Sequence, residues 1–243
     1  MSDTISFLLA KQKVENDLDL RAENFISPGE MKDLFNQAID FVEAEVHKLG
    51  LEDEYFLKQS AIPLVAGTQD YNMPADIYAN KIKGLVFSES LTNTYEVRRV
   101  RGQKRFVDIK LTELFDSSTI DHRYIVVNNS ANTPQIRLVP SAKITSTTAL
   151  TIWYTRNAAK VVDDADLIDV PEFFSYIIQF VKNEIKIKEG TLNDVDIINL
   201  AREQKNMTDT LTEMIPDRDD FILADTEFYE EFSYPNYGGR HGI

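Results

Sequence analysis

Four aspartates that precede an apolar run are the group in this sequence best suited to binding a hard cation. They are Asp163, Asp164, Asp166 and Asp169, and Ca²⁺ or Mg²⁺ prefers several carboxylate oxygens. The spacing departs from that of a calcium loop, because no glycine stands at the sharp turn and the terminal glutamate is misplaced. The dipole of a following helix also favours acidic residues here. We therefore expect neither a metal ion nor a cofactor.

The three histidines, His47, His122 and His241, lack partners at the spacing of a metal site or a catalytic triad. His47 falls on the polar side of a predicted helix, and we expect all three to be ordinary surface residues. The sequence also lacks cysteine, a glycine-rich phosphate loop, an H-E-x-x-H pair and a G-x-S-x-G turn. None of its many carboxylates stands out as a glycosidase pair. We expect a protein without catalytic residues.

A strip of basic residues between Tyr95 and Phe106 is the part of the chain most like a nucleic-acid-binding site. It contains Arg98, Arg99 and Arg101. Arginines between aromatic residues can hold a phosphate backbone, but valine alternating with arginine is also typical of a strand with one solvated face. The chain as a whole has a net charge of −14, which repels nucleic acid on average. We therefore favour a protein–protein contact over DNA binding for this strip.

Residues 217–243 mix acidic and aromatic side chains without a regular apolar period. Their acidic character and the basic residues between 81 and 110 suit head-to-tail pairing of copies, although both could simply be solvated surfaces. Aromatic side chains often anchor an extended segment on a partner. We expect an arm that docks on a neighbouring subunit, and the alternative is a tail that wraps around its own domain. The candidate contacts are Phe221, Phe228, Tyr229, Phe232, Tyr234 and Tyr237.

Long amphipathic helices are predicted on both sides of a strand-rich region. The first spans 27–49, where Ser27 caps the N-terminus and Glu30 completes a capping box. Two more are predicted over 171–189 and 193–214, each with one apolar stripe. Since no such helix can bury its stripe alone, the helices must pack together.

The region between these helices is predicted to form short strands, because it is rich in Val, Ile, Tyr and Trp and is divided by turns. The first strand is expected at 55–57, a short helix at 108–115, and a turn at 128–134 that joins two antiparallel strands. The result is an α+β fold, a helical bundle with an inserted antiparallel β sandwich or barrel. We divide the chain into an N-terminal helical part, a β module, C-terminal helices and an extended arm, at residues 1–53, 54–160, 161–216 and 217–243.

Four short phrases occur in this order along the chain: DYNMPADI at 70–77, PQIRLVP at 134–140, LTIWY at 150–154 and DLIDVPE at 166–172. With the order of helices and strands, they resemble the head-to-tail adaptor proteins of short-tailed bacteriophages, of the tail tubular protein A and head-completion type. The resemblance covers roughly residues 27–215. Met73 stands where these proteins usually have leucine.

The resemblance implies a structural virion protein that forms a ring, commonly of twelve copies, under the portal. Its partners would be other copies of the chain, the portal protein and a downstream tail or ring protein. DNA would pass through the ring without sequence-specific binding, since an acidic wall neutralises few phosphates. No membrane partner is expected, because no stretch approaches 18 uninterrupted apolar residues.

The expected location follows from this function: synthesis in the host cytoplasm, then a place in the virion at the portal vertex. One alternative is another ring or stopper protein of the same tail stack. Less favoured alternatives are a cytoplasmic hydrolase, which should show concentrated reactive residues, and a nucleic-acid-binding protein, which should show a dominant basic face.

Overall fold

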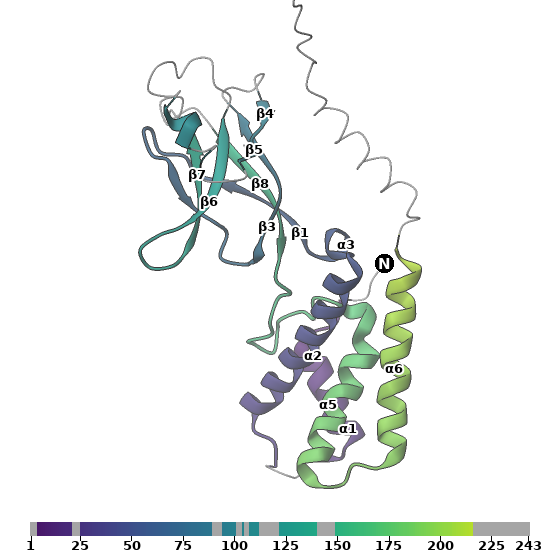
Figure 1. Ribbon diagram of the computed structural model, residues 1–243. Helices are drawn as coiled ribbons and strands as arrows, with labels where there is room; N and C mark the ends of the chain where they lie inside the picture. Colours follow the sequence, from purple (N-terminus) through teal and green to yellow (C-terminus); the bar gives the residue numbers. More distant parts are fainter. Residues whose placement is uncertain are drawn as a thin grey trace, which may run out of the picture.

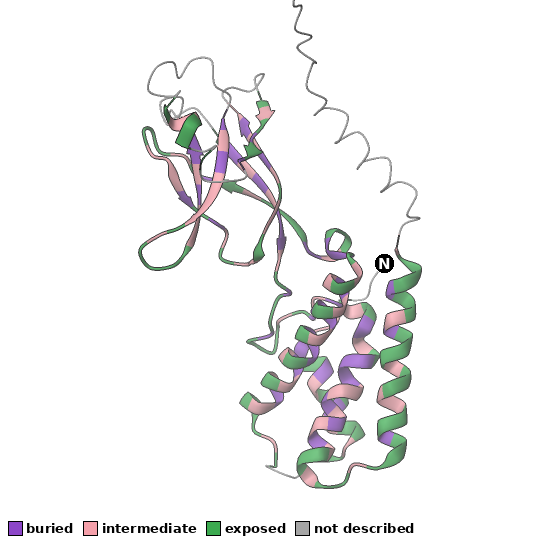
Figure 2. Cartoon of the chain, in the orientation of Figure 1, coloured by how far each residue is buried: buried purple, intermediate pink, exposed green. Residues whose placement is uncertain are grey.

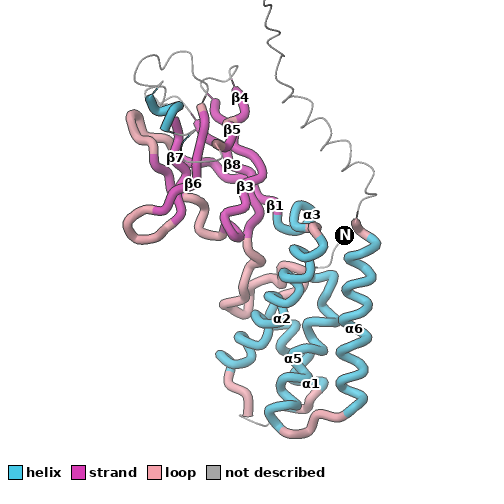
Figure 3. The backbone as a smooth tube through the Cα atoms, in the orientation of Figure 1, coloured by secondary structure: helices cyan, strands magenta, loops and turns pink. Residues whose placement is uncertain are grey.

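A computed structural model describes residues 4–20, 25–88, 94–100, 104, 107–111, 122–139 and 149–215 (Figure 1). Apart from a short helical segment at residues 107–111 within the strand region, helices and strands lie in separate regions, cyan and magenta in Figure 3. The helices come from both ends of this range and the strands from its middle. The α+β fold, with strands inserted between packed helices, is therefore confirmed.

The helical part is a bundle of four long helices. α1 is Phe7–Asp17, α2 is Pro28–Leu49, α5 is Phe174–Glu189 and α6 is Asp194–Glu213. A 3-10 turn, η3 at Pro171–Phe173, leads into α5, and the short α3, Glu52–Phe56, follows α2. None of the helices in the described ranges has the length and apolar character that crossing a membrane requires.

The ends of α2 follow the predicted signals with one difference. The Ser27 hydroxyl accepts a hydrogen bond from the Glu30 N–H at 3.2 Å, and Gly50 ends the helix in the left-handed conformation, with φ 76°. The Glu30 carboxylate, however, accepts a hydrogen bond from Lys188 on α5 at 2.5 Å, so it connects two helices. A complete capping box occurs instead at α6, between Asn193 and Asp196.

The bundle core contains side chains from all four long helices and from the segment that precedes α5. Phe7 packs edge-on against Phe35, with ring centroids 5.2 Å apart. Figure 2 shows buried residues along the inward sides of the helices. The C-terminal helices therefore bury their stripes against the N-terminal ones, as the helical periodicity predicts.

The strands form two four-stranded sheets, in the orders β1-β8-β3-β4 and β2-β7-β6-β5. Their inward side chains share one apolar core, so the sheets form a sandwich and do not close into a barrel. The strands are β1 Leu57–Ile62, β2 Asp70–Asn72, β3 Ile77–Ser88, β4 Thr94–Glu96, β5 Arg98–Arg99, β6 Arg123–Asn128, β7 Pro134–Val139 and β8 Ala149–Arg156.

Two details of the β module differ from the prediction. The expected strand at 55–57 is wrong at its start, because the chain stays helical through Phe56 and the strand begins at Leu57. β5 pairs parallel with β6, whereas the other strand pairs are antiparallel. The turn at 128–134 does join antiparallel strands, β6 and β7. Residues 107–111 are helical, and the rest of the helix expected at 108–115 lies outside the described residues.

Candidate functional site

The structure describes two of the nine residues that sequence analysis proposes as contacts. Arg98 and Arg99 form β5 at an edge of the second sheet, and both are exposed between the buried Val97 and Val100. Because strand side chains alternate between the two faces, one exposed arginine lies on each face of β5, which differs from the single solvated face that the sequence suggests. Arg101 lies outside the described residues, as do the six aromatic residues of the arm.

Three of the four aspartates of the candidate cation group have separate partners. Asp164 pairs with Lys11 on α1 at 3.1 Å, and Asp169 pairs with Arg156 on β8. The Asp166 carboxylate accepts hydrogen bonds from the backbone N–H groups of Val162 and Asp163. Within the described ranges, no group of three or more acidic or histidine side chains is arranged to hold a metal ion.

Two of the histidines are buried, so their assignment to the surface is wrong. The His47 side chain is only 6% exposed, and His122 is completely buried, with its ring 3.9 Å from that of Phe87. His241 lies outside the described residues. His47 lies where the bundle meets the β module, because Tyr78 on β3 covers its ring.

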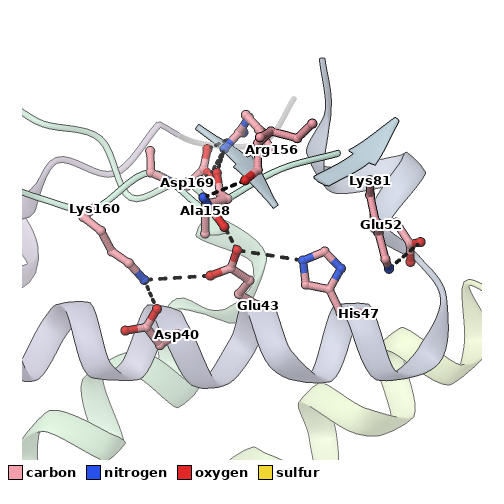
Figure 4. A network of polar contacts seen from close by, with 12 residues as sticks. Asp40, Glu43, His47, Glu52, Lys81, Arg156, Ala158, Lys160 and Asp169 are labelled. Atoms are coloured by element: carbon pink, nitrogen blue, oxygen red, sulfur yellow. Dashed lines mark hydrogen bonds and ion pairs between the residues drawn. The ribbon is translucent and has the colours of Figure 1, made fainter. Parts of the chain in front are cut away.

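The chain crosses between bundle and β module at two neighbouring points. The first crossing is from Phe56 to Leu57, where α3 becomes β1. The second follows Arg156, where β8 ends. β1 and β8 are antiparallel partners with Leu57 opposite Thr155, so the two crossings lie side by side. The polar side chains around them form a network that we call the junction (Figure 4). It consists of Asp40, Glu43, His47, Glu52, Lys81, Arg156, Lys160 and Asp169.

Arg156 links three elements at the junction. Its guanidinium donates hydrogen bonds of 2.5 and 2.8 Å to the two oxygens of Asp169, and it lies over the ring of Phe56 on α3, 5.5 Å from the centroid. Asp169 also accepts a hydrogen bond from the Ala159 N–H at 2.9 Å. The hydrogen bonds to Asp169 raise the pKa of Arg156, so the guanidinium stays charged in this contact.

Glu43 on α2 binds the chain that returns from the β module. Its carboxylate accepts a hydrogen bond from the Ala158 N–H at 2.9 Å, and Lys160 lies 3.9 Å away, next to Asp40 as well. Burial raises the pKa of Glu43. The hydrogen bond from Ala158 and the nearby Lys160 hold the segment that follows β8 against α2.

His47 lies one helical turn after Glu43 and packs against the β module. Its ring stacks on that of Tyr78, with centroids 3.7 Å apart and planes at 13°. β3 is irregular here, because Ala79 and Asn80 have positive φ values of 46° and 58°. Burial, and then the positive charge of Lys81, lower the pKa of His47. The neutral ring serves as a flat packing surface between helix and strand.

Glu52 at the start of α3 completes the junction. Its carboxylate accepts hydrogen bonds from Lys81 and Lys83 of β3, at 3.1 and 3.2 Å. Burial favours a higher pKa, but hydrogen bonds from its own backbone N–H and from both lysines prevail and lower the pKa of Glu52 to about 2. It therefore holds β3 onto the bundle as a charged group.

The turn before β3 adds a further contact beside the junction. The Asp76 carboxylate accepts hydrogen bonds from Lys58 on β1 and from the Tyr154 hydroxyl on β8, both at 2.7 Å. Burial and the bond to Asp76 raise the pKa of Tyr154. Most charged groups here are therefore neutralised by a neighbour, which suits a fixed mechanical connection between the two parts of the chain.

The chain is similar to a known protein family over nearly its whole length. A family model described as SU10 adaptor protein matches residues 6–225. The chain belongs to the SU10 adaptor protein family. This family consists of bacteriophage head–tail adaptors, so the chain is a structural protein of a phage. No curated protein matches the chain.

Sequence analysis missed the junction of this SU10 adaptor family member. Asp40, Glu43 and His47 recur at helical spacing along α2, and this polar stripe was the available signal. A polar stripe on a helix normally faces water. Only the tertiary structure shows that the last turns of α2 are covered on this side by β3 and by the chain after β8.

Proposed function

We propose that this protein is the head-to-tail adaptor of a short-tailed phage and forms an oligomeric ring, of twelve copies, under the portal. The ring extends the DNA channel and docks the next tail component. The observation that carries the proposal is the family match, which spans the bundle, the β module and the first part of the arm. In this proposal the chain keeps the division at residues 1–53, 54–160, 161–216 and 217–243.

The acidic character of the chain supports the channel function. Each copy has a net charge of −14, so the ring repels DNA on average and neutralises few phosphates. DNA then slides through without sequence-specific binding. A tight, salt-dependent complex of the purified ring with duplex DNA would contradict this.

Electron microscopy of the purified protein and of the virion tests the proposal. We expect closed rings of the protein alone, or particles in which it occupies the portal vertex between portal and tail. The adaptor function fails if the protein is a monomer that is absent from assembled particles. A position further down the tail stack would identify it as another ring or stopper protein.

The basic strip is proposed as one subunit or portal contact. Arg98 and Arg99 are exposed on an edge strand, and Arg101 follows them in the sequence. Changing these three arginines to alanine should weaken assembly by roughly tenfold, since rim charges act mainly on association. Size-exclusion chromatography at several concentrations measures the effect. Changing Lys205, which is exposed on α6, to alanine is the control, and equal assembly of both variants would remove the strip from the interface.

The second proposed contact is the arm. Its aromatic residues Phe221, Phe228, Tyr229, Phe232, Tyr234 and Tyr237 would supply apolar anchors on a neighbouring subunit or on the portal, with acidic side chains between them. The acidic arm of one copy also suits the basic strip of another.

A further inference from the structure

β1 is the longest edge strand of the two sheets among the described residues. It has six residues, whereas the other edges, β4, β2 and β5, have three, three and two. β1 pairs with β8 on one side, and no backbone hydrogen bond between described residues reaches its other side. An edge of this length is a template for one more strand.

The surface of β1 carries little that would keep another strand away. Leu57 is 46% exposed, and Lys58, Gln59 and Ala61 are exposed as well. The strand contains no proline and no acidic residue. Its single charge, on Lys58, is already paired with Asp76. Edges that proteins protect usually carry proline, a bulge or several charges.

The described chain ends next to the start of this strand. The Tyr55 hydroxyl donates a hydrogen bond to the Met214 sulfur at 3.3 Å, and Tyr55 precedes Leu57, the first residue of β1, by only two positions. In Figure 1 the end of α6 lies at the level of α3, which leads into β1. The described chain therefore ends close to the start of β1.

That segment contains one run with the composition of a strand. Residues 221–224 are Phe-Ile-Leu-Ala, and Asp220 and Asp225 flank them. The family match extends to residue 225, so it includes this run and excludes the aromatic residues that follow. The run therefore belongs to the part of the chain that the family has in common.

We propose that residues 221–224 of one copy pair along the free edge of β1 in the next copy of the ring. The inference rests on the proposed ring. Rotation about the ring axis leaves equivalent atoms of all copies at the same height along that axis. An arm that begins near its own β1 therefore begins at the height of the neighbour's β1. Residues 216–221 form the linker to this run and span at most about 20 Å when extended, which sets the greatest distance at which the neighbour's β1 can lie. Backbone hydrogen bonds supply the affinity, and alternate side chains supply the specificity.

Disulfide cross-linking tests this pairing, since the sequence contains no cysteine. Gln59→Cys in one full-length chain is mixed with Leu223→Cys in another, and Ile222→Cys is tested in parallel because strand side chains alternate. We expect a covalent dimer in the ring fraction after oxidation. Asn72→Cys on β2, an exposed edge residue of the other sheet, is the control and should give no dimer.

Three results would overturn the inference. Rings without a cross-link would reject the strand pairing and leave the adaptor function intact, whereas a chain that forms no rings at all would reject both. A chain carrying both cysteines that closes on itself at high dilution would place the run on its own β1 instead.

A proline variant gives an independent measurement. Leu223→Pro removes one backbone donor from the added strand and should weaken ring association by about tenfold, with an unchanged melting temperature. Leu223→Val keeps the donor and suits a strand, so its association should match that of the wild type. Equal association of the proline and valine variants would exclude a strand at this position.

Discussion

Replacing Arg156 with methionine should lower the free energy of unfolding by about 2–4 kcal/mol, a loss of roughly 6–12 °C in melting temperature for a chain of this size. The Arg156 and Asp169 side chains are only 21% and 16% exposed. Without the guanidinium, the Asp169 carboxylate stays largely buried and unpaired, which costs more than an exposed ion pair provides. Methionine retains the apolar contact with Phe56. Chemical denaturation followed by circular dichroism measures the change.

Two further variants separate the charge effect from a general loss of stability. Lys205→Met breaks a pair with Asp209 whose side chains are 77% and 56% exposed, so it should change stability by less than about 0.5 kcal/mol. Adding Asp169→Asn to the Arg156 variant removes the unpaired charge and should recover part of the loss. A cost below about 1 kcal/mol for Arg156→Met would show that the junction tolerates the unpaired carboxylate.

Removing residues 217–243 should abolish ring formation and leave the cooperative unfolding transition in place. Among the described residues, the buried side chains of the bundle and of the sandwich lie between Phe7 and Leu211, so the truncated chain keeps all of them. It loses all six proposed aromatic anchors, and a few such anchors usually supply most of the binding energy of an interface. Light scattering measures assembly, and thermal unfolding measures the remaining fold.

A matched variant separates the aromatic residues from the acidic ones. Changing the six aromatic residues of the arm to serine keeps every charge and should lose assembly nearly as completely as the truncation. If the truncated chain loses its cooperative transition, the arm belongs to its own core, and the proposed docking on a neighbour is wrong.

The helices were predictable because local signals and packing agree in them. Ser27 and Gly50 are residues that the ends of α2 require, and the apolar period between them gives the buried side. The turn at 128–134 was predictable for the same reason, since Asn132 can adopt the positive φ of 60° observed there. In these places, the residue types alone determine the local conformation.

The errors occur where a second contact surface overrides the local pattern. Tyr55 and Phe56 have the composition of a strand, but their rings pack with each other and, for Tyr55, with Phe173 of the bundle, and the chain stays helical. His47 lies on the polar side of α2, yet Tyr78 from a distant part of the sequence covers it. A periodicity within one helix contains no information about such a neighbour.

The pairing of the junction charges was hidden for a similar reason. Asp169 looked like one of four acidic residues before a helix, and its partner Arg156 stands in the strand-rich region, 13 positions earlier. Their short hydrogen bonds exist because the chain between them turns back over α2, where Glu43 holds the Ala158 N–H. Sequence spacing alone cannot distinguish such a paired carboxylate from a metal ligand.

The adjacent chain crossings have a consequence for how such proteins can diversify. The two strands that enter and leave the β module are direct neighbours in one sheet, with Leu57 opposite Thr155, so their backbones are about one strand spacing apart. A bundle that presents two adjacent chain ends can accept a different insert, or only a short turn, without moving its helices. Recombination between phage genomes can therefore exchange the inserted β module while the bundle is inherited unchanged.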